Sequence, residues 1–115
     1  MDATRFFSIL GHPVRLRALV LLQREGELCV CELTHALGLL QPVVSRHLAL
    51  LREAGLVDAH REGQWMHYRL APGLPSWQRE VLEQTATALG GQEPYVSDAA
   101  LLGEMPNRPG SRCCA

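Results

Sequence analysis

The chain has 115 residues, enough for one small domain with its own hydrophobic core. Hydrophobic residues make up 47% of it and charged residues 20%, which excludes a disordered or fibrous protein. The formal net charge of −1 excludes a uniformly basic nucleic-acid coat. The apolar run at residues 18–22 is too short to span a bilayer and lacks the cleavage pattern of a signal peptide. We therefore expect a cytoplasmic protein without membrane contact.

The basic residues are all arginines, and their position along the chain is more informative than their number. Residues 41–71 contain four arginines against three acidic residues, together with three histidines. After residue 72 the acidic residues outnumber the arginines. A local basic stretch of this kind is typical of a surface that faces DNA.

Apolar residues at helical spacing predict four helices in the first half of the chain. These are a short helix around Phe6, Phe7 and Leu10, a central helix that opens at Pro13, a short helix carrying Val30, Leu33 and Leu37, and a helix over residues 41–54. The third and fourth helices are separated by a few residues around Gly38, which is typical of a helix-turn-helix.

The pattern then changes to a period of two over residues 57–70, with a turn at residues 62–64, which predicts a two-stranded hairpin. A last amphipathic helix follows over residues 77–89. We therefore expect a mainly α (α+β) winged helix-turn-helix with about five helices and a two-stranded wing. Residues 1–90 form the DNA-binding and dimerisation domain in this interpretation, and residues 91–115 form a loosely ordered tail.

A helix that lies in the major groove keeps an apolar inner face and offers polar groups outward near its start. In the fourth helix the inner face is Val44, Leu48 and Leu51. A glutamine can pair with adenine, and an arginine with guanine or phosphate. The residues expected to contact DNA are Gln41, Val43, Ser45, Arg46 and Arg52 of this helix, with Arg61 and Gln64 of the hairpin.

Four segments in order resemble the arsenical-resistance repressor (ArsR/SmtB) family: LGHPVRLR at residues 10–17, QPVVSRHL at 41–48, LREAGLV at 51–57 and REGQWMHYRL at 61–70. The resemblance covers roughly residues 4–90. It implies a winged helix-turn-helix homodimer that binds double-stranded operator DNA without a cofactor and represses a resistance operon. It also adds His47, part of the Ser-Arg-His-Leu motif, as a residue that is structural or close to DNA.

The resemblance further implies that the first and last helices form the dimer contact. The corresponding residues here are Phe6, Phe7, Leu10, Val81, Leu82 and Leu89. One departure from the family pattern concerns the recognition helix. Leu40 stands where the family often has a helix-capping serine, so the start of this helix is left open.

Cys29 and Cys31 lie one residue apart at the start of the third helix. Thiolates are the preferred ligands of soft ions, and cysteines of a cytosolic protein more often serve metal or redox chemistry than disulfides. Residues i and i+2 of a regular helix point about 200° apart, so they cannot bind one ion together. In an extended segment they share a face. Binding should therefore require the first turn of this helix to unwind.

The same two cysteines resemble part of the site of the arsenite-responsive branch, whose pattern is Cys-x-Cys-x-x-Cys. Here Thr34 takes the place of the third cysteine. The resemblance implies As(III) or Sb(III) as inducer, with Cys29 and Cys31 as ligands. The third ligand is left open: Cys113 or Cys114, water and a small thiol are the candidates, and the alternative is a tail whose cysteines are incidental.

Other interpretations of the cysteine pair remain. A repressor of the same fold could respond to Cd(II), Pb(II) or oxidation, and the two cysteines could simply be small buried hydrophobes. A thiol enzyme such as an arsenate reductase is disfavoured because Glu27 and Glu32 would repel an oxyanion. We expect no enzymatic activity.

Overall fold

The fold is that of a computed structural model, which describes residues 1–106. Within this range the elements are α1 (Ala3–Leu10), α2 (Pro13–Glu25), β1 (Glu27–Cys29), α3 (Val30–Leu37), α4 (Gln41–Glu53), β2 (Val57–Glu62), β3 (Trp65–Leu70), α5 (Ser76–Leu89) and α6 (Tyr95–Glu104). The predicted winged helix-turn-helix is confirmed, with one helix and one strand more than expected. None of the helices in the described residues is long and apolar enough to cross a membrane.

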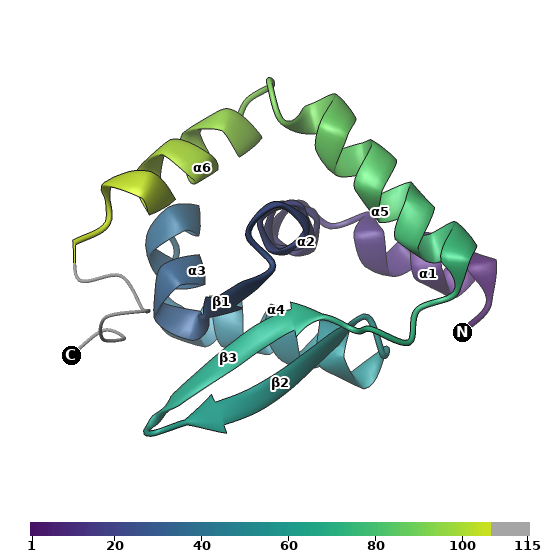
Figure 1. Ribbon diagram of the computed structural model, residues 1–115, viewed down its shortest axis with the longest axis horizontal. Coiled ribbons are helices and arrows are strands. Elements are labelled where there is room, and N and C mark those ends of the chain that lie inside the picture. The colour runs from purple at the N-terminus through teal and green to yellow at the C-terminus, as the bar shows by residue number, and fades with distance from the viewer. Residues whose placement is uncertain (107–115) are drawn as a thin grey trace.

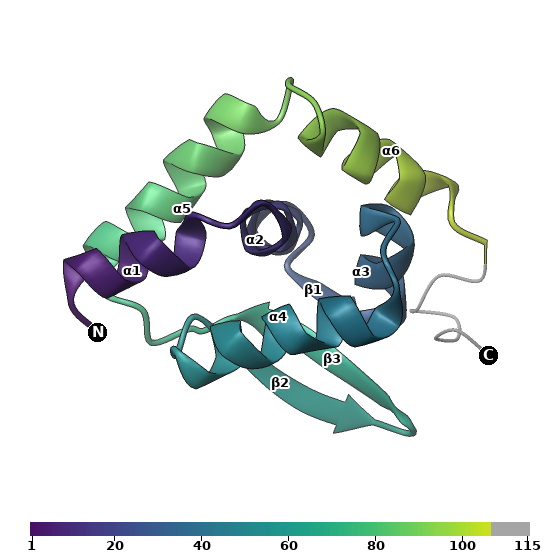
Figure 2. The same cartoon turned by 180° about the vertical axis from the view of Figure 1, so that it is seen from behind.

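Helix α2 forms the centre of the molecule. It is seen end-on in Figures 1 and 2, surrounded by the other helices and the sheet. Its residues 18–22 are all buried, as the lack of a polar face predicts. Pro13 opens the helix, and the Nδ1 atom of His12 caps it by accepting the backbone N–H of Val14 at 3.1 Å.

The helix-turn-helix consists of α3, a tight turn and α4. The turn is made at Gly38, whose φ of 66° lies in the left-handed region that favours glycine. Helix α4 begins without a side-chain cap at Leu40. The carbonyl of Leu40 accepts the N–H groups of Val43 and Val44, and Pro42 has no N–H to satisfy. The inner face of α4 is buried as predicted, so its register is set by the core.

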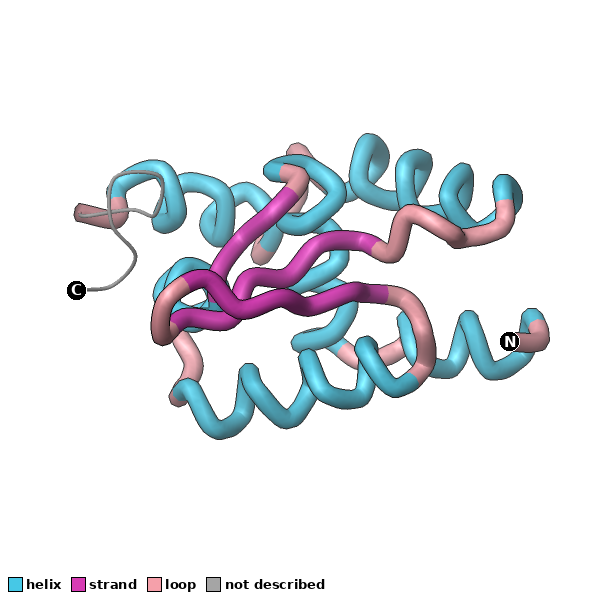
Figure 3. The backbone as a smooth tube through the Cα atoms, turned by 60° about the horizontal axis from the view of Figure 1, so that its bottom comes forward, coloured by secondary structure: helices cyan, strands magenta, loops and turns pink. Residues whose placement is uncertain are grey.

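The sheet has three strands in the order β1-β3-β2, which lie side by side in Figure 3. The hairpin of β2 and β3 is confirmed, and its turn uses Gly63 at a φ of 63°. The expectation of only two strands is wrong, because Glu27–Cys29 pairs antiparallel with β3. This strand is three residues long, too short for an alternating pattern to show in the sequence.

The expectation of a loosely ordered chain from residue 91 is wrong for residues 95–104, which form α6. Asp98 on α6 is 2% exposed and pairs with Arg17 on α2 through two hydrogen bonds of 2.7 and 2.9 Å. Arg17 also donates to the carbonyl of Leu37, the last residue of α3, at 3.0 Å. The hydrogen bonds that Arg17 donates to Asp98 raise the pKa of Arg17. This contact joins three helices around one guanidinium.

The residues predicted to form a dimer contact divide into two groups. Phe6, Leu10 and Leu82 belong to the chain's own core, with 0%, 7% and 3% exposure, so they have almost no surface to offer a partner. Val81 and Leu89 are half-buried and Phe7 is exposed. Trp77, which the sequence analysis did not include, is also exposed and packs edge-on against Phe6, with 5.1 Å between ring centroids.

Candidate nucleic-acid interface and inducer site

The outer surface of α4 presents polar side chains to solvent. Gln41, Arg46 and Arg52 are exposed, as expected of groups that reach base edges or phosphates. Val43 and Ser45 are half-buried. They can still take part in a close contact with DNA, but they present less surface than the three exposed residues. Since Leu48 and Leu51 fill the opposite face, α4 can approach a groove from one side only.

The hairpin extends beyond α4 as a wing. Arg61 at the end of β2 and Gln64 in the turn are both exposed. Arg69 on β3 is also exposed, but it lies 3.7 Å from the carboxylate of Asp58 and is partly neutralised by it. The positive charge at the tip of the wing therefore comes from Arg61.

His47 is turned away from the outer face of α4. Its ring packs against the ring of His12, with centroids 4.3 Å apart, and its Nδ1 lies 3.3 Å from Nη1 of Arg15. Arg15 also donates from Nε to the carbonyl of Ile9 at 2.7 Å. His47 thus ties α4 to the start of α2. Sequence reasoning missed His12 and Arg15, although both lie in the LGHPVRLR segment and face the same side three residues apart.

The surroundings of His47 disfavour a positive charge. Partial burial, followed by the nearby His12, Arg15 and Arg46, lowers the pKa of His47 from its usual value. A guanidinium can only donate, so Nδ1 of His47 accepts from Arg15 and Nε2 carries the proton of the neutral ring. The contact between α2 and α4 therefore depends on a neutral histidine.

Cys29 occupies the junction between β1 and α3. It ends the strand, it is the N-cap of the helix, and it is completely buried. Its sulfur accepts the backbone N–H of Glu32, and the carboxylate of Glu32 accepts the backbone N–H of Cys29 at 2.9 Å. This is a capping box in which cysteine replaces serine or threonine. Sequence reasoning missed the role of Glu32, although the spacing of residues 29 and 32 is that of a capping box.

Cys31 is the second residue of α3 and is half-buried. Thr34 follows one turn later on the same face, and its hydroxyl donates to the carbonyl of Val30 at 2.8 Å. Cys29 already has an extended backbone, with φ −84° and ψ 165°, so only Val30 and Cys31 would have to leave the helix. The candidates Cys113 and Cys114 lie outside the described residues.

Comparison with known proteins agrees with this architecture. The protein family described as "Bacterial regulatory protein, arsR family" matches residues 12–59, from the cap of α2 to the start of the wing. The arsenic resistance transcriptional regulator ArsR1 of Pseudomonas putida is 51% identical over 91% of this chain and 80% of its own. ArsR2 of the same organism is 47% identical over 94% of both chains. The chain belongs to the ArsR family.

A solved structure of a repressor with a stated metalloid specificity has a similar fold. The AntR antimony-specific transcriptional repressor superposes with a TM-score of 0.64 at 31% sequence identity, covering 75% of each chain. The ArsR-family assignment makes this chain a DNA-binding transcriptional regulator.

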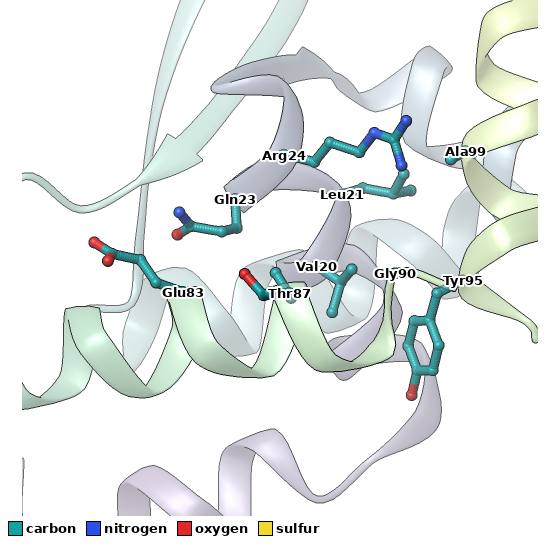
Figure 4. A pocket seen from close by; sticks show the side chains of 10 residues that line it. Val20, Leu21, Gln23, Arg24, Glu83, Thr87, Gly90, Tyr95 and Ala99 are labelled. Carbon is teal, nitrogen blue, oxygen red and sulfur yellow. The ribbon is translucent and has the colours of Figure 1, made fainter. Parts of the chain in front are cut away.

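A separate pocket of about 480 Å³ opens between α2, α5 and α6. Figure 4 shows the side chains around it. Its lining is Val20, Leu21, Gln23, Arg24, Glu83, Ala86, Thr87, Gly90, Tyr95 and Ala99. These residues include neither cysteine nor histidine, so the pocket offers no ligand for a soft ion. The start of α3 is the better candidate for an inducer site of this ArsR-family protein.

The lowered pKa of His47 predicts a pH dependence of stability. A histidine whose pKa is lower in the folded state contributes its full stability above the unfolded value of 6.5, and this contribution is lost as the pH falls through the folded pKa. His47→Asn keeps an acceptor for Arg15 but does not titrate. We expect urea unfolding at pH about 7.5 and about 5.5 to show a smaller loss of stability for this variant than for the parent protein. Equal losses in both proteins would contradict the assignment.

Proposed function

We propose that this protein represses an arsenic-resistance operon and leaves its operator when As(III) or Sb(III) binds Cys29 and Cys31. The observation that carries the proposal is that Cys29 is the N-cap of α3 and that its thiol is also a ligand suited to soft ions. The relatives support the inducer class, because ArsR1 and ArsR2 are arsenic resistance regulators and AntR is antimony-specific.

The capping box supplies a mechanism for release. A metalloid that bonds to the sulfur of Cys29 competes with the N–H of Glu32 for the same atom. Loss of an N-cap destabilises a helix by about 1 kcal/mol. Helix α3 has only eight residues and packs directly on α4, so a change in its first turn is transmitted to the recognition helix. Binding of the metalloid and binding of DNA therefore oppose each other.

The exposed residues of α4 and the wing supply the DNA contacts in this proposal. Gln41 and Arg46 read base edges in the major groove, and Arg52 contacts a phosphate. Arg61 and Gln64 reach the adjacent backbone or minor groove from the wing. His47 acts indirectly, because it positions α4 through Arg15 and His12.

Operator binding measured with and without arsenite tests the proposal. Fluorescence anisotropy with a labelled duplex of the protein's own promoter region should show tight binding, weakened by arsenite by about 5- to 150-fold. Cys29→Ser/Cys31→Ser should bind the duplex as the parent does, because serine is itself a good N-cap, but should not respond to arsenite. Cys113→Ser/Cys114→Ser is the matched control for the tail. An arsenite response retained in Cys29→Ser/Cys31→Ser would refute the proposal.

A gain-of-function variant follows from the position of Thr34. It lies one turn after Cys31 on the same helix face, so Thr34→Cys would add a third sulfur to the site. The lost hydroxyl bonds only to a carbonyl within the helix, so we expect the fold to be kept. Since changes around a metal site alter affinity by about 10- to 100-fold, arsenite should release this variant from DNA at roughly tenfold lower concentration. Thr87→Cys, which changes an exposed threonine on α5, is the control and should leave the response unchanged.

A homodimer completes the proposal, as the family pattern implies. The surface available for it includes the exposed rings of Phe7 on α1 and Trp77 on α5, whose centroids are 6.2 Å apart. Phe7→Glu should raise the dimer dissociation constant in sedimentation experiments by at least about tenfold. Val96→Glu changes another exposed apolar residue, on α6, and should not affect association. An unchanged dimer in Phe7→Glu would exclude this face.

A further inference from the structure

Two glutamates and two histidines lie together on one face of the sheet. His67 is in the central strand β3, opposite Cys29 of β1 on one side and His60 of β2 on the other. Side chains alternate along a strand, so Glu27 shares the face of Cys29, and Glu62 shares the face of His60. The cluster thus takes residues from all three strands and lies beside the proposed inducer site.

Both histidine rings lie between the same two carboxylates. Nδ1 and Nε2 of His67 are 3.6 and 3.7 Å from oxygens of Glu27 and Glu62. The corresponding nitrogens of His60 are 3.9 and 3.4 Å from the same two glutamates. The rings are stacked, with centroids 5.4 Å apart. Two negative groups and two imidazoles therefore converge on a small part of the surface.

We propose that Glu27, Glu62 and His67 bind a divalent cation of the Zn²⁺ class, with His60 beside them as a further donor. One ligand atom from each of the three lies within 4.8 Å of the others. Imidazole nitrogen with carboxylate oxygen is a donor set for zinc and similar ions, whereas trivalent arsenic prefers thiolates and magnesium prefers oxygen alone. This site is chemically distinct from the cysteine pair.

The geometry needs only a small adjustment. Ligands of a tetrahedral zinc ion with bonds of about 2.1 Å are roughly 3.4 Å apart, about 1.4 Å less than the 4.8 Å limit on the spacing here. His67 is fixed in the middle of the sheet with a side chain that is 11% exposed. Glu27 and Glu62 have side chains that are 42% and 63% exposed, so both can rotate toward the histidine. The buried imidazole therefore provides the anchor and the carboxylates close around the ion.

A cation at this site would cross-link β1 to the wing. Glu27 begins the strand that ends at Cys29, and Glu62 ends the strand that carries Arg61. The ion would join the segment that leads into α3 to the segment that contacts DNA. It should therefore stabilise the folded sheet whether or not a metalloid is present.

Cobalt binding to a full-length protein without cysteines tests the proposal. In Cys29→Ser/Cys31→Ser/Cys113→Ser/Cys114→Ser we expect Co²⁺ to produce visible d–d absorption without a thiolate charge-transfer band, and Zn²⁺ to displace it. Adding Glu62→Gln, an exposed change at the end of β2, should weaken Co²⁺ binding at least about tenfold. His67→Gln should abolish it, with circular dichroism as the check on folding.

Asp58→Asn is the matched control. Asp58 lies on the same face of β2 but pairs with Arg69, and its replacement should leave Co²⁺ affinity unchanged. In the parent protein Zn²⁺ should raise the midpoint of thermal unfolding, and Glu62→Gln should reduce that rise. Absence of Co²⁺ binding in the cysteine-free protein would overturn the proposal. Equal weakening in Glu62→Gln and Asp58→Asn would do the same.

Discussion

The stability of α3 at its two ends is the constraint on which the rest of the structure depends. A helix of eight residues is too short to be stable by itself, so it needs caps and packing. At its start the thiol of Cys29 and the carboxylate of Glu32 satisfy each other's backbone N–H groups. At its end Arg17 donates to the carbonyl of Leu37. Helix α3 supports α4, so the recognition helix is correctly placed only while these end contacts hold.

Local patterns made the DNA-binding half of the molecule predictable from sequence. The apolar stripes of α3 and α4, the glycine between them and the alternation of the hairpin are short-range signals, and the structure follows them. The outward positions of Gln41 and Arg46 follow from the same period. These features depend on residues a few positions apart, which is the distance over which periodicity is informative.

The features that could not be predicted depend on contacts between distant residues. Strand β1 exists because Leu28 and its neighbours pair with β3, some forty residues away along the chain. Helix α6 is held by Asp98 and Arg17, separated by 81 positions, in a segment whose prolines and glycines suggested a loose tail. The family resemblance placed Phe6 in a dimer contact, and the apolar stripe of its helix does not indicate whether Phe6 packs on its own chain or on another.

The position of His47 shows the same limit within a recognised motif. The sequence placed it between Arg46 and Leu48 on the recognition helix, where either a DNA contact or a structural contact was consistent with the pattern. Two residues at the start of α2 decide which way its side chain points. His12, the cap of α2, packs against the ring, and Arg15 donates to the Nδ1 atom. The helix-turn-helix is therefore anchored to the core at two points, through His47 on α4 and through Leu37 on α3.

The capping box also limits how strongly inducer and DNA can oppose each other. Losing a side-chain cap destabilises a helix by about 1 kcal/mol, and a typical hydrogen bond such as the one that Glu32 accepts contributes about 0.5–1.5 kcal/mol. Allosteric couplings are typically about 1–3 kcal/mol, so disruption of this one box would be enough for the proposed release. Linkage is reciprocal, so in the proposed switch DNA that holds α4 in place would weaken metalloid binding at Cys29 by the same factor. In the proposed switch, a thiol in the capping position, where serine would cap at least as well, lets one buried atom serve both the fold and the response to the metalloid.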